Sequence, residues 1–185
     1  MKEIRIHGRG GQGSLVLAQF MAIAALEDKK YGQAFPFLGG GGERRGKAIM
    51  AYCRIDDRPI RIRCRVEEPD CVIVQDPTIF DEVDVALGLK EEGTILVNTD
   101  KDLSQFKPWM ARYRVFTIYA DELAKEILGR PIINTALLGA FAGVTKALSL
   151  GAVLKAVKSR FPGQLGEKNA LIVDKSYKRM LERLS

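Results

Sequence analysis

The sequence is poor in the residues that most often build catalytic and metal sites. It holds one histidine, His7, and three cysteines, Cys53, Cys64 and Cys71. A single histidine leaves few ways to form a metal site or a Ser–His pair. No C-x-x-C spacing occurs, which argues against an iron–sulfur cluster or a zinc ribbon, and an odd number of cysteines without short spacings argues against a disulfide framework. We therefore expect the cysteines to be small buried residues on strands.

Long apolar runs are also missing. The most apolar stretch covers residues 15–26, is interrupted by Gln19 and is too short to span a bilayer. The first three residues, Met-Lys-Glu, lack the charged-then-apolar pattern of a signal peptide. These features predict a cytoplasmic protein that does not enter a membrane.

Motifs of common catalytic machinery are absent, because the sequence has neither a G-x-S-x-G string nor a P-loop. Acidic pairs such as Glu67-Glu68 lie in expected turns, where a solvated surface explains them. The formal net charge of +6 is modest. It suits an acidic ligand such as a nucleotide or CoA, an acidic partner subunit, or solubility alone. Nucleic-acid binding is not expected, because it would require more basic charge with interleaved aromatic residues.

Hydrophobic periodicity predicts an α/β fold in one domain, residues 1–185. We expect a Rossmann-like, mostly parallel sheet with helices on both faces, a β-hairpin and a helical C-terminal part. Asn134 is expected to be a helix N-cap, and Gly139 and Gly143 to allow close contact with another helix. The predicted strands are 3–7, 49–55, 60–66, 71–74, 94–97 and 115–119, with 49–55 and 60–66 forming the hairpin. The predicted helices are 14–26, 80–91, 121–128, 134–148, 152–160 and 168–184, and 31–47 is predicted to be a long loop.

A glycine-rich string, residues 8–13 (Gly-Arg-Gly-Gly-Gln-Gly), follows the first strand and precedes the first helix. It fits G-x-G-x-x-G in the context that dinucleotide binding requires. Glycines permit a sharp turn and close approach of a ligand, the helix start offers free N–H groups to a phosphate, and Arg9 could add a forked contact. The usual ribose-binding carboxylate is not in place, because Glu27 and Asp28 stand at the end of a helix rather than after a second strand. Three interpretations stay open: a phosphate or partner-subunit contact, a tight turn without a ligand, and independent NAD or FAD binding.

A second cluster consists of four glycines at 39–42 followed by Glu43, Arg44 and Arg45. Two adjacent arginines on a loop can clamp phosphates or carboxylates. The alternative is a solvated loop in which Glu43 pairs locally. Three arginines at alternate positions between 61 and 65 predict a solvated or subunit-facing strand surface.

The string at 8–13 is more specific than G-x-G-x-x-G. It resembles the opening of the gamma subunits of 2-oxoacid:ferredoxin oxidoreductases, in particular pyruvate synthase and its relatives. Residues 34–37 (Ala-Phe-Pro-Phe) with 42–46 (Gly-Glu-Arg-Arg-Gly) resemble a second hallmark of these subunits, and 134–139 (Asn-Thr-Ala-Leu-Leu-Gly) resemble a third. The three motifs occur in the family's order over almost the whole chain. The glycines at 39–42 are a departure, because they lengthen the segment before Glu43.

The resemblance implies a complete enzyme that decarboxylates a 2-oxoacid on thiamine diphosphate, passes electrons through iron–sulfur clusters to ferredoxin and transfers the acyl group to CoA. It also implies that the partner subunits hold the cofactors: beta binds the diphosphate and magnesium, alpha contacts the thiamine pyrimidine, and delta carries the 4Fe–4S clusters. The gamma chain is then expected to bind no cofactor alone. In single-chain relatives the matching domain has been linked to CoA binding.

We therefore expect a non-catalytic gamma subunit of an oxidoreductase that converts a 2-oxoacid, expected to be pyruvate, into acyl-CoA. Its two loops should flank one end of the sheet and shape a cleft that faces CoA or the thiamine site of a neighbouring subunit. Arg9, Arg44 and Arg45 would meet CoA phosphates, and Ser14 would fix the helix start. Two alternatives are a purely structural assembly subunit and a stand-alone NAD-dependent oxidoreductase. The candidate site residues are Gly8, Arg9, Gly10, Gly11, Gln12, Gly13, Ser14, Glu43, Arg44 and Arg45.

Overall fold

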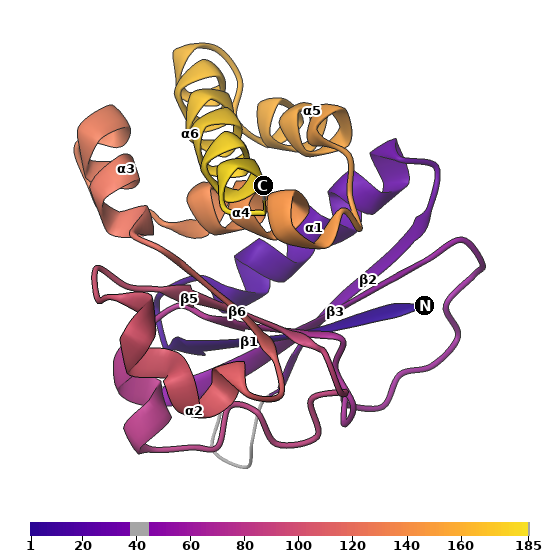
Figure 1. Cartoon of the computed structure of the whole chain (residues 1–185). Helices are drawn as coiled ribbons and strands as arrows, with labels where there is room; N and C mark the ends of the chain where they lie inside the picture. Colours follow the sequence, from indigo (N-terminus) through magenta and orange to yellow (C-terminus); the bar gives the residue numbers. More distant parts are fainter. Residues whose placement is uncertain (38–44, 185) are drawn as a thin grey trace.

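The computed structural model describes residues 1–37 and 45–184, and it contains a six-stranded sheet in the order β2-β3-β1-β4-β5-β6 (Figure 1). β1, β4, β5 and β6 pair in parallel, whereas β3 is antiparallel to both β1 and β2. The α/β class is confirmed, with a mixed sheet. The strands are β1 (Lys2–Arg9), β2 (Tyr31–Phe37), β3 (Ala48–Asp56), β4 (Cys71–Val74), β5 (Thr94–Asn98) and β6 (Arg114–Ile118).

The long helices form one layer on the same side of the sheet (Figure 1). One large apolar core joins this layer to the sheet, and a smaller core on the opposite face packs short helical turns against β4, β5 and β6. The layer is made of α1 (Ser14–Glu27), α3 (Ala120–Leu128), α4 (Asn134–Thr145), α5 (Leu150–Arg160) and α6 (Gln164–Glu182). The opposite face carries α2 (Lys107–Met110) and the 3-10 turns η1 (Pro77–Asp81) and η2 (Leu103–Phe106). No helix in the described ranges is long and apolar enough to cross a bilayer.

The central parallel strands are short and apolar because both of their faces are covered. Every residue of β4 and β5 is buried, which is the pattern expected for strands inside an α/β fold. The predicted close contact of helix 134–145 is confirmed as well. A Cβ at Gly139 would collide with the backbone of Val173, and one at Gly143 would crowd Met180, so α4 and α6 approach closely along these glycines.

The predicted hairpin is wrong in its second strand. Residues 60–66 form no strand, and β3 pairs instead with β2, which lies inside the segment predicted to be a loop. The five glycines at 39–42 and 46 led to the prediction of a loop over the whole of 31–47. In the structure β2 is an edge strand, where proline is tolerated, and Gly32 lets it pass against the backbone of Ala22 in α1.

The predicted helix over 80–91 is also wrong. After η1 the chain makes turns, with Gly88 at φ 73 and Glu92 at φ 57, both in the left-handed region. The guanidinium of Arg5 on β1 donates to the carbonyl groups of Val85 and Leu87, at 3.0 Å and 2.5 Å. These carbonyls are the groups that a helix would need for its own hydrogen bonds, so the contact with β1 replaces helix formation.

Candidate ligand cleft at the carboxyl end of the sheet

The glycine loop and the end of the second cluster lie side by side beyond the end of β1. Gly10 forms a parallel bridge with Arg45, and the Gly10 N–H donates to the Lys47 carbonyl at 2.9 Å. The Gly46 N–H donates back to the Gly10 carbonyl at 3.0 Å. Arg45 is therefore placed against the glycine loop, as expected from the sequence. Glu43 and Arg44 lie outside the described residues.

The loop itself makes the tight turn predicted from its glycines. Gly11 has φ 95, and Gly13 has φ 76 with ψ 36, so both occupy the left-handed region that favours glycine. Gln12 closes the turn, because its side-chain oxygen accepts the Arg9 N–H at 2.7 Å and its own N–H donates to the Arg9 carbonyl at 2.9 Å. Gly13 is the N-cap of α1 and brings no capping side chain. Within residues 1–37 and 45–184, no side chain caps the first turn of α1, which is the condition that suits an external anion or carbonyl.

Gly8 is needed because two polar side chains meet directly against it. A Cβ at this position would collide with the side chains of Gln75 and Ser14. The Ser14 hydroxyl donates to Gln75 Oε1 at 2.5 Å, and both residues are almost fully buried. Ser14 is the first residue of α1, so this bond fixes the helix start to the end of β4.

Gln75 and Asn98 extend this contact into a buried network that sequence reasoning missed. The Gln75 side-chain amide donates to Asn134 Oδ1 at 2.9 Å, and its backbone carbonyl accepts the Asn98 amide at 2.9 Å. Asn98 also donates to Asp121 at 2.8 Å and accepts the Ala120 N–H at 2.9 Å. Two amides after β4 and at the end of β5 therefore hold the starts of α1, α3 and α4 around one point.

The expected N-cap role of Asn134 is wrong, for the same reason. Ile133 is the N-cap of α4, and the Asn134 side chain accepts from Gln75 instead of capping its helix. The signal for the network was present in the sequence, because a polar residue follows the apolar run of β4 and another ends β5. Carboxyl ends of parallel strands meet at one edge of a sheet, so such residues converge.

Arg9 is occupied by protein groups. Its guanidinium lies 2.8 Å from Glu82 Oε1 and 3.3 Å from Asp76 Oδ2, and it also donates to the Thr78 hydroxyl and the Gly46 carbonyl. The hydrogen bond with Glu82 raises the pKa of Arg9 above its ordinary value. Burial disfavours the ionised form of Asp76, but hydrogen bonds from Thr78 and the charge of Arg9 outweigh it, so its pKa is lowered. Arg9 thus ties the glycine loop to η1.

The glycine loop, the residues after β4 and β5 and the starts of α3 and α4 line a cleft of about 650 Å³, which lies at the carboxyl ends of β1, β4 and β5 and is open to solvent. Neighbouring strands β1 and β4 send the chain to opposite faces, to α1 and to η1, so the cleft lies at a switch point of the sheet, where α/β proteins bind ligands. Its charged side chains are three carboxylates and one ammonium. The lining residues are Gly11, Gln12, Gly13, Gln75, Asp76, Pro77, Asn98, Thr99, Asp100, Tyr119, Asp121, Lys125, Pro131, Ile132, Ile133 and Asn134.

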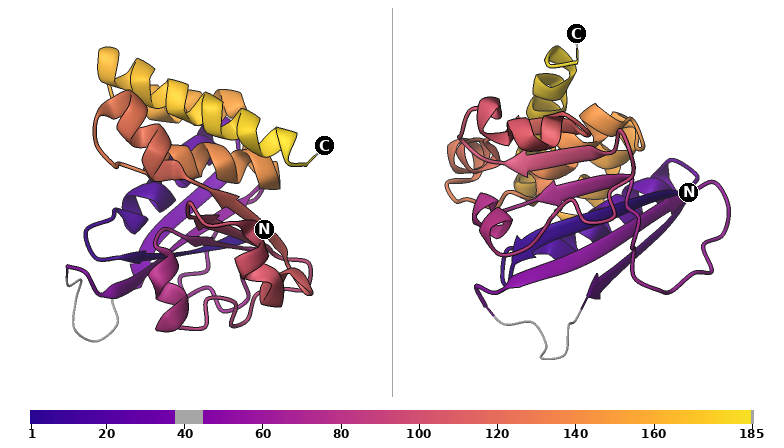
Figure 2. Two further views of the ribbon diagram at one scale, coloured as in Figure 1. Left: turned by 60° about the vertical axis from the view of Figure 1, so that its left-hand side comes forward. Right: turned by 60° about the horizontal axis from the view of Figure 1, so that its bottom comes forward.

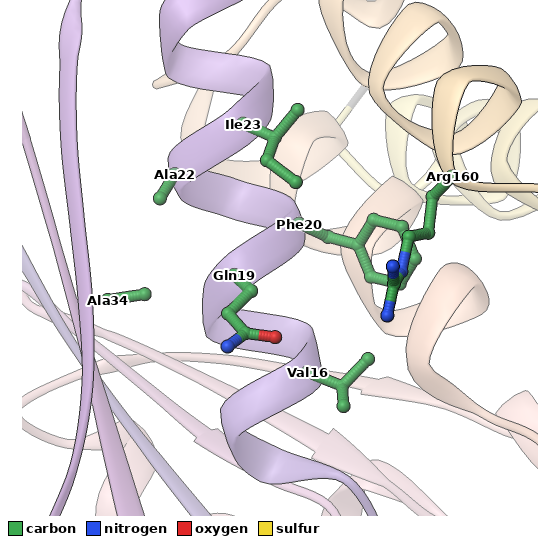
Figure 3. A pocket seen from close by; sticks show the side chains of 7 residues that line it. All are labelled: Val16, Gln19, Phe20, Ala22, Ile23, Ala34 and Arg160. Carbon is green, nitrogen blue, oxygen red and sulfur yellow. The ribbon is translucent and has the colours of Figure 1, made fainter.

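A second hollow, of about 410 Å³, lies between α1, β2 and the end of α5 (Figure 3). Its walls are mainly apolar, and the polar heads on it belong to Gln19 and Arg160. It offers neither a carboxylate pair nor a glycine loop. The loop-lined cleft is therefore the better candidate for binding a polar ligand. The hollow is lined by Val16, Gln19, Phe20, Ala22, Ile23, Ala34 and Arg160.

The order of the strands beside β1 argues against the usual mode of dinucleotide binding. In that arrangement the strand beside β1 is parallel and ends in a carboxylate for the ribose. Here the neighbour of β1 on that side is the antiparallel β3. Asp28 is used elsewhere, because its carboxylate accepts from the Ser149 N–H and hydroxyl at 2.7 Å and 2.5 Å.

Metal-binding and cysteine chemistry find no support in the described part of the chain. No group of three or more His, Cys, Asp or Glu side chains that could hold a metal ion occurs there. Cys53 and Cys71 are buried, as expected, and burial raises the pKa of both thiols. Cys64 is exposed, because the segment that carries it is not the predicted strand.

Comparison with known proteins agrees with the three motifs and with the fold. Residues 3–179 match the family model described as pyruvate ferredoxin/flavodoxin oxidoreductase. The chain belongs to this family. It is 49% identical over 183 residues to pyruvate synthase subunit PorC of Methanocaldococcus jannaschii, covering 99% of each chain. It is 46% identical to the common subunit gamma of the pyruvate/ketoisovalerate oxidoreductases of Thermococcus kodakarensis, covering 97% of each.

A solved relative shows that the fold is shared. The crystal structure of pyruvate oxidoreductase subunit PORC from Thermotoga maritima superimposes with a TM-score of 0.83 at 36% identity. The match covers 96% of this chain and 95% of that one. That subunit therefore shares the architecture of this chain over nearly the whole length of both.

Proposed function

We propose that this chain is the gamma subunit of a pyruvate:ferredoxin oxidoreductase and that its carboxyl-end cleft faces CoA. The complete enzyme would convert pyruvate and CoA into acetyl-CoA and CO2 while two electrons reduce ferredoxin. The alpha, beta and delta subunits would hold thiamine diphosphate, magnesium and the 4Fe–4S clusters. This chain would supply binding surface and assembly contacts rather than reacting groups.

The observation that carries the proposal is the geometry of the glycine loop. Gly13 leaves the start of α1 without a side-chain cap, and Arg45 is bridged to Gly10 in the same loop. Backbone N–H groups at a helix start together with an adjacent guanidinium form a site for a phosphate or pyrophosphate. CoA carries both groups, and its pantetheine arm needs little charge along its path.

Two of the three carboxylates of the cleft have partners inside the protein, and the third, Asp100, is exposed. Asp76 is compensated by Arg9, and Asp121 accepts from Asn98 in the first turn of α3, where a helix favours negative charge. Their charges are thus used inside the protein. The cleft retains the uncapped start of α1 and Lys125 as its electropositive features.

The proposed division of labour follows from the residues present. Among the described residues there is no cluster of metal ligands, and the chain contains no C-x-x-C motif. The subunit of Thermococcus kodakarensis is named as common to pyruvate and ketoisovalerate oxidoreductases. A gamma chain shared in this way does not choose the oxoacid, which supports placing the oxoacid pocket in other subunits.

The test uses the assembled enzyme with Arg44→Ala and Arg45→Ala, each measured for its Michaelis constant toward CoA and toward pyruvate. Loss of a charge-assisted phosphate contact should raise the CoA constant by about 10-fold or more and leave the pyruvate constant unchanged. Lys155→Ala is the matched control, because Lys155 is exposed on α5, away from the cleft. Unchanged CoA constants in both arginine variants would reject the CoA-facing role.

A purely structural subunit is the second candidate, favoured by the fact that Arg9 and Gln75 already have protein partners. In that case the loop would only seal an interface. Gly13→Ala forces a side chain into the left-handed region and against Asn134. If this variant fails to assemble with the other subunits, while the complex that still forms has a normal Michaelis constant for CoA, the structural role is correct.

A further inference from the structure

One face of β1, β2 and β3 has no helix over it (Figure 2). Residues 57–66, here called the arginine strap, leave the end of β3 and run along this side. The strap is fixed by Arg54, a fully buried residue of β3 whose guanidinium donates to the carbonyls of Ile62 and Arg65, each at 3.3 Å. Arg54 is itself paired with Glu3 at 2.8 Å. An irregular surface segment is thus held by an ion-paired residue inside the fold.

The strap carries positive charge that the chain does not neutralise. Arg58, Arg61 and Arg63 are exposed, and none of the three guanidinium groups forms an ion pair or hydrogen bond with any described residue. Arg65 differs, because it pairs with Glu67 at 3.0 Å. Three uncompensated arginines within six residues, on a backbone that Arg54 holds in place, make a fixed array of forked donors for carboxylates.

Apolar side chains accompany this charge. Ile62 stands between two of the free arginines and is 47% exposed. On the same face Phe35, Phe37 and Met50 are half-buried, and the Arg54 guanidinium lies 5.1 Å from the centre of the Phe35 ring. Aromatic residues, methionine and arginine are the types enriched in the centres of protein–protein interfaces.

We propose that the arginine strap and these apolar neighbours form the docking surface for a carboxylate-rich segment of another subunit of the same oxidoreductase. The inference rests on the proposed function, because it takes the chain to work as an assembled subunit. Charge complementarity selects an acidic partner for the free arginines. The exposed Ile62 favours a protein partner over a nucleic acid, because isoleucine packs against apolar side chains and makes no favourable contact with a phosphate backbone.

The experiment titrates the full-length chain into the purified remaining subunits and measures the dissociation constant at low and high salt. Arg61→Glu combined with Arg63→Glu reverses the free charges and touches no internal bond. The matched control is Lys155→Glu with Lys168→Glu, which makes the same charge change on α5 and α6. The expected result is an affinity about 100-fold or more weaker for the strap variant and within about 3-fold of wild type for the control. The wild-type affinity should also weaken with salt.

Each other outcome counts against the proposal. Equal affinities for the strap variant and the wild type overturn it, and so does an equal loss in the control, because the effect would then be general charge repulsion. Binding of a poly-uridine RNA, or self-association of the chain, that is lost in the strap variant while subunit affinity stays normal would assign the surface to those partners instead. If the reversal impairs folding, Arg61→Ala with Arg63→Ala replaces it, with about a 10-fold loss expected. Failure of the wild-type chain itself to associate would refute the proposed function rather than the docking surface.

Discussion

His7 should make the stability of this protein depend on pH on the acidic side of neutrality. The residue lies on β1, is 3% exposed, and its Nε2 accepts the Arg5 Nε–H at 3.1 Å. Burial first, and then the charge of Arg5, lower its pKa from the ordinary 6.5 to about 3. His7 is the single histidine of the sequence, so its contribution can be isolated by one substitution.

The sign and the size follow from proton linkage. The folded state keeps His7 neutral down to about pH 3, whereas the unfolded chain takes up a proton below about pH 6.5. Stability is therefore complete above the unfolded pKa and falls as the pH is lowered toward the folded one. Between about pH 7 and pH 5 the free energy of unfolding should decrease by about 2 kcal/mol from this residue alone.

The assay is urea denaturation of the full chain at both pH values, for the wild type and for His7→Gln. Glutamine keeps an acceptor for Arg5 and has no proton to gain. The variant should lose about 2 kcal/mol less than the wild type over this interval, and the carboxylate contribution is common to both. Identical pH profiles would show that His7 titrates normally and that the burial argument is wrong. We expect the loss of stability to extend to the cleft, because the His7 carbonyl accepts the Gln75 N–H at 2.8 Å.

Other substitutions test the helix contacts, the amide network and the strap. Gly139→Ala should lower the free energy of unfolding by about 1–3 kcal/mol, because its Cβ would run into α6, whereas Gly151→Ala on α5 has open space and should raise it by about 0.5–1 kcal/mol. Urea titrations in which both variants shift alike would contradict the glycine-mediated contact. Gln75→Leu should cost about 1–3 kcal/mol by leaving buried polar partners unpaired, and an unchanged denaturation midpoint would count against the network. Arg54→Met should release the strap and raise tryptic cleavage after the arginines of 57–66 by about 10-fold, seen by mass spectrometry; equal cleavage would show that Arg54 does not anchor it.

The secondary structure was predicted correctly where it is decided by local hydrophobic periodicity or by the conformations that glycine permits. The strand at 3–7, the turn at 8–13 and the helix after it appear as expected, because G-x-G-x-x-G fixes backbone conformations directly. The buried strands at 71–74 and 94–97 were also predicted correctly, since short continuous apolar runs are typical of parallel strands that are covered on both faces.

Prediction failed where distant residues decide local structure. The glycines after residue 38 predicted a loop over all of 31–47, but 31–37 pairs with β3 at the sheet edge and packs against α1. Residues 60–66 alternate between apolar and charged side chains like a strand. In the structure the Arg54 guanidinium donates to two of their carbonyls, and the segment pairs with no strand. Side-chain hydrogen bonds between residues far apart in sequence leave no periodic signal. The network around Gln75 was missed although the polar residues after β4 and at the end of β5 pointed to it.

The antiparallel strand beside β1 distinguishes the surroundings of this glycine loop from those in a dinucleotide fold. In a dinucleotide fold the neighbour of the glycine loop is a parallel strand whose carboxyl end presents an acid to the ribose. β3 runs the other way, so the chain enters it beside the loop and brings 45–47 into contact with Gly10. That position is occupied by a basic segment and not by a carboxylate. The glycine turn therefore has Arg45 beside it in place of a ribose-binding acid, and this difference supports the proposal that the turn faces a phosphate rather than a dinucleotide.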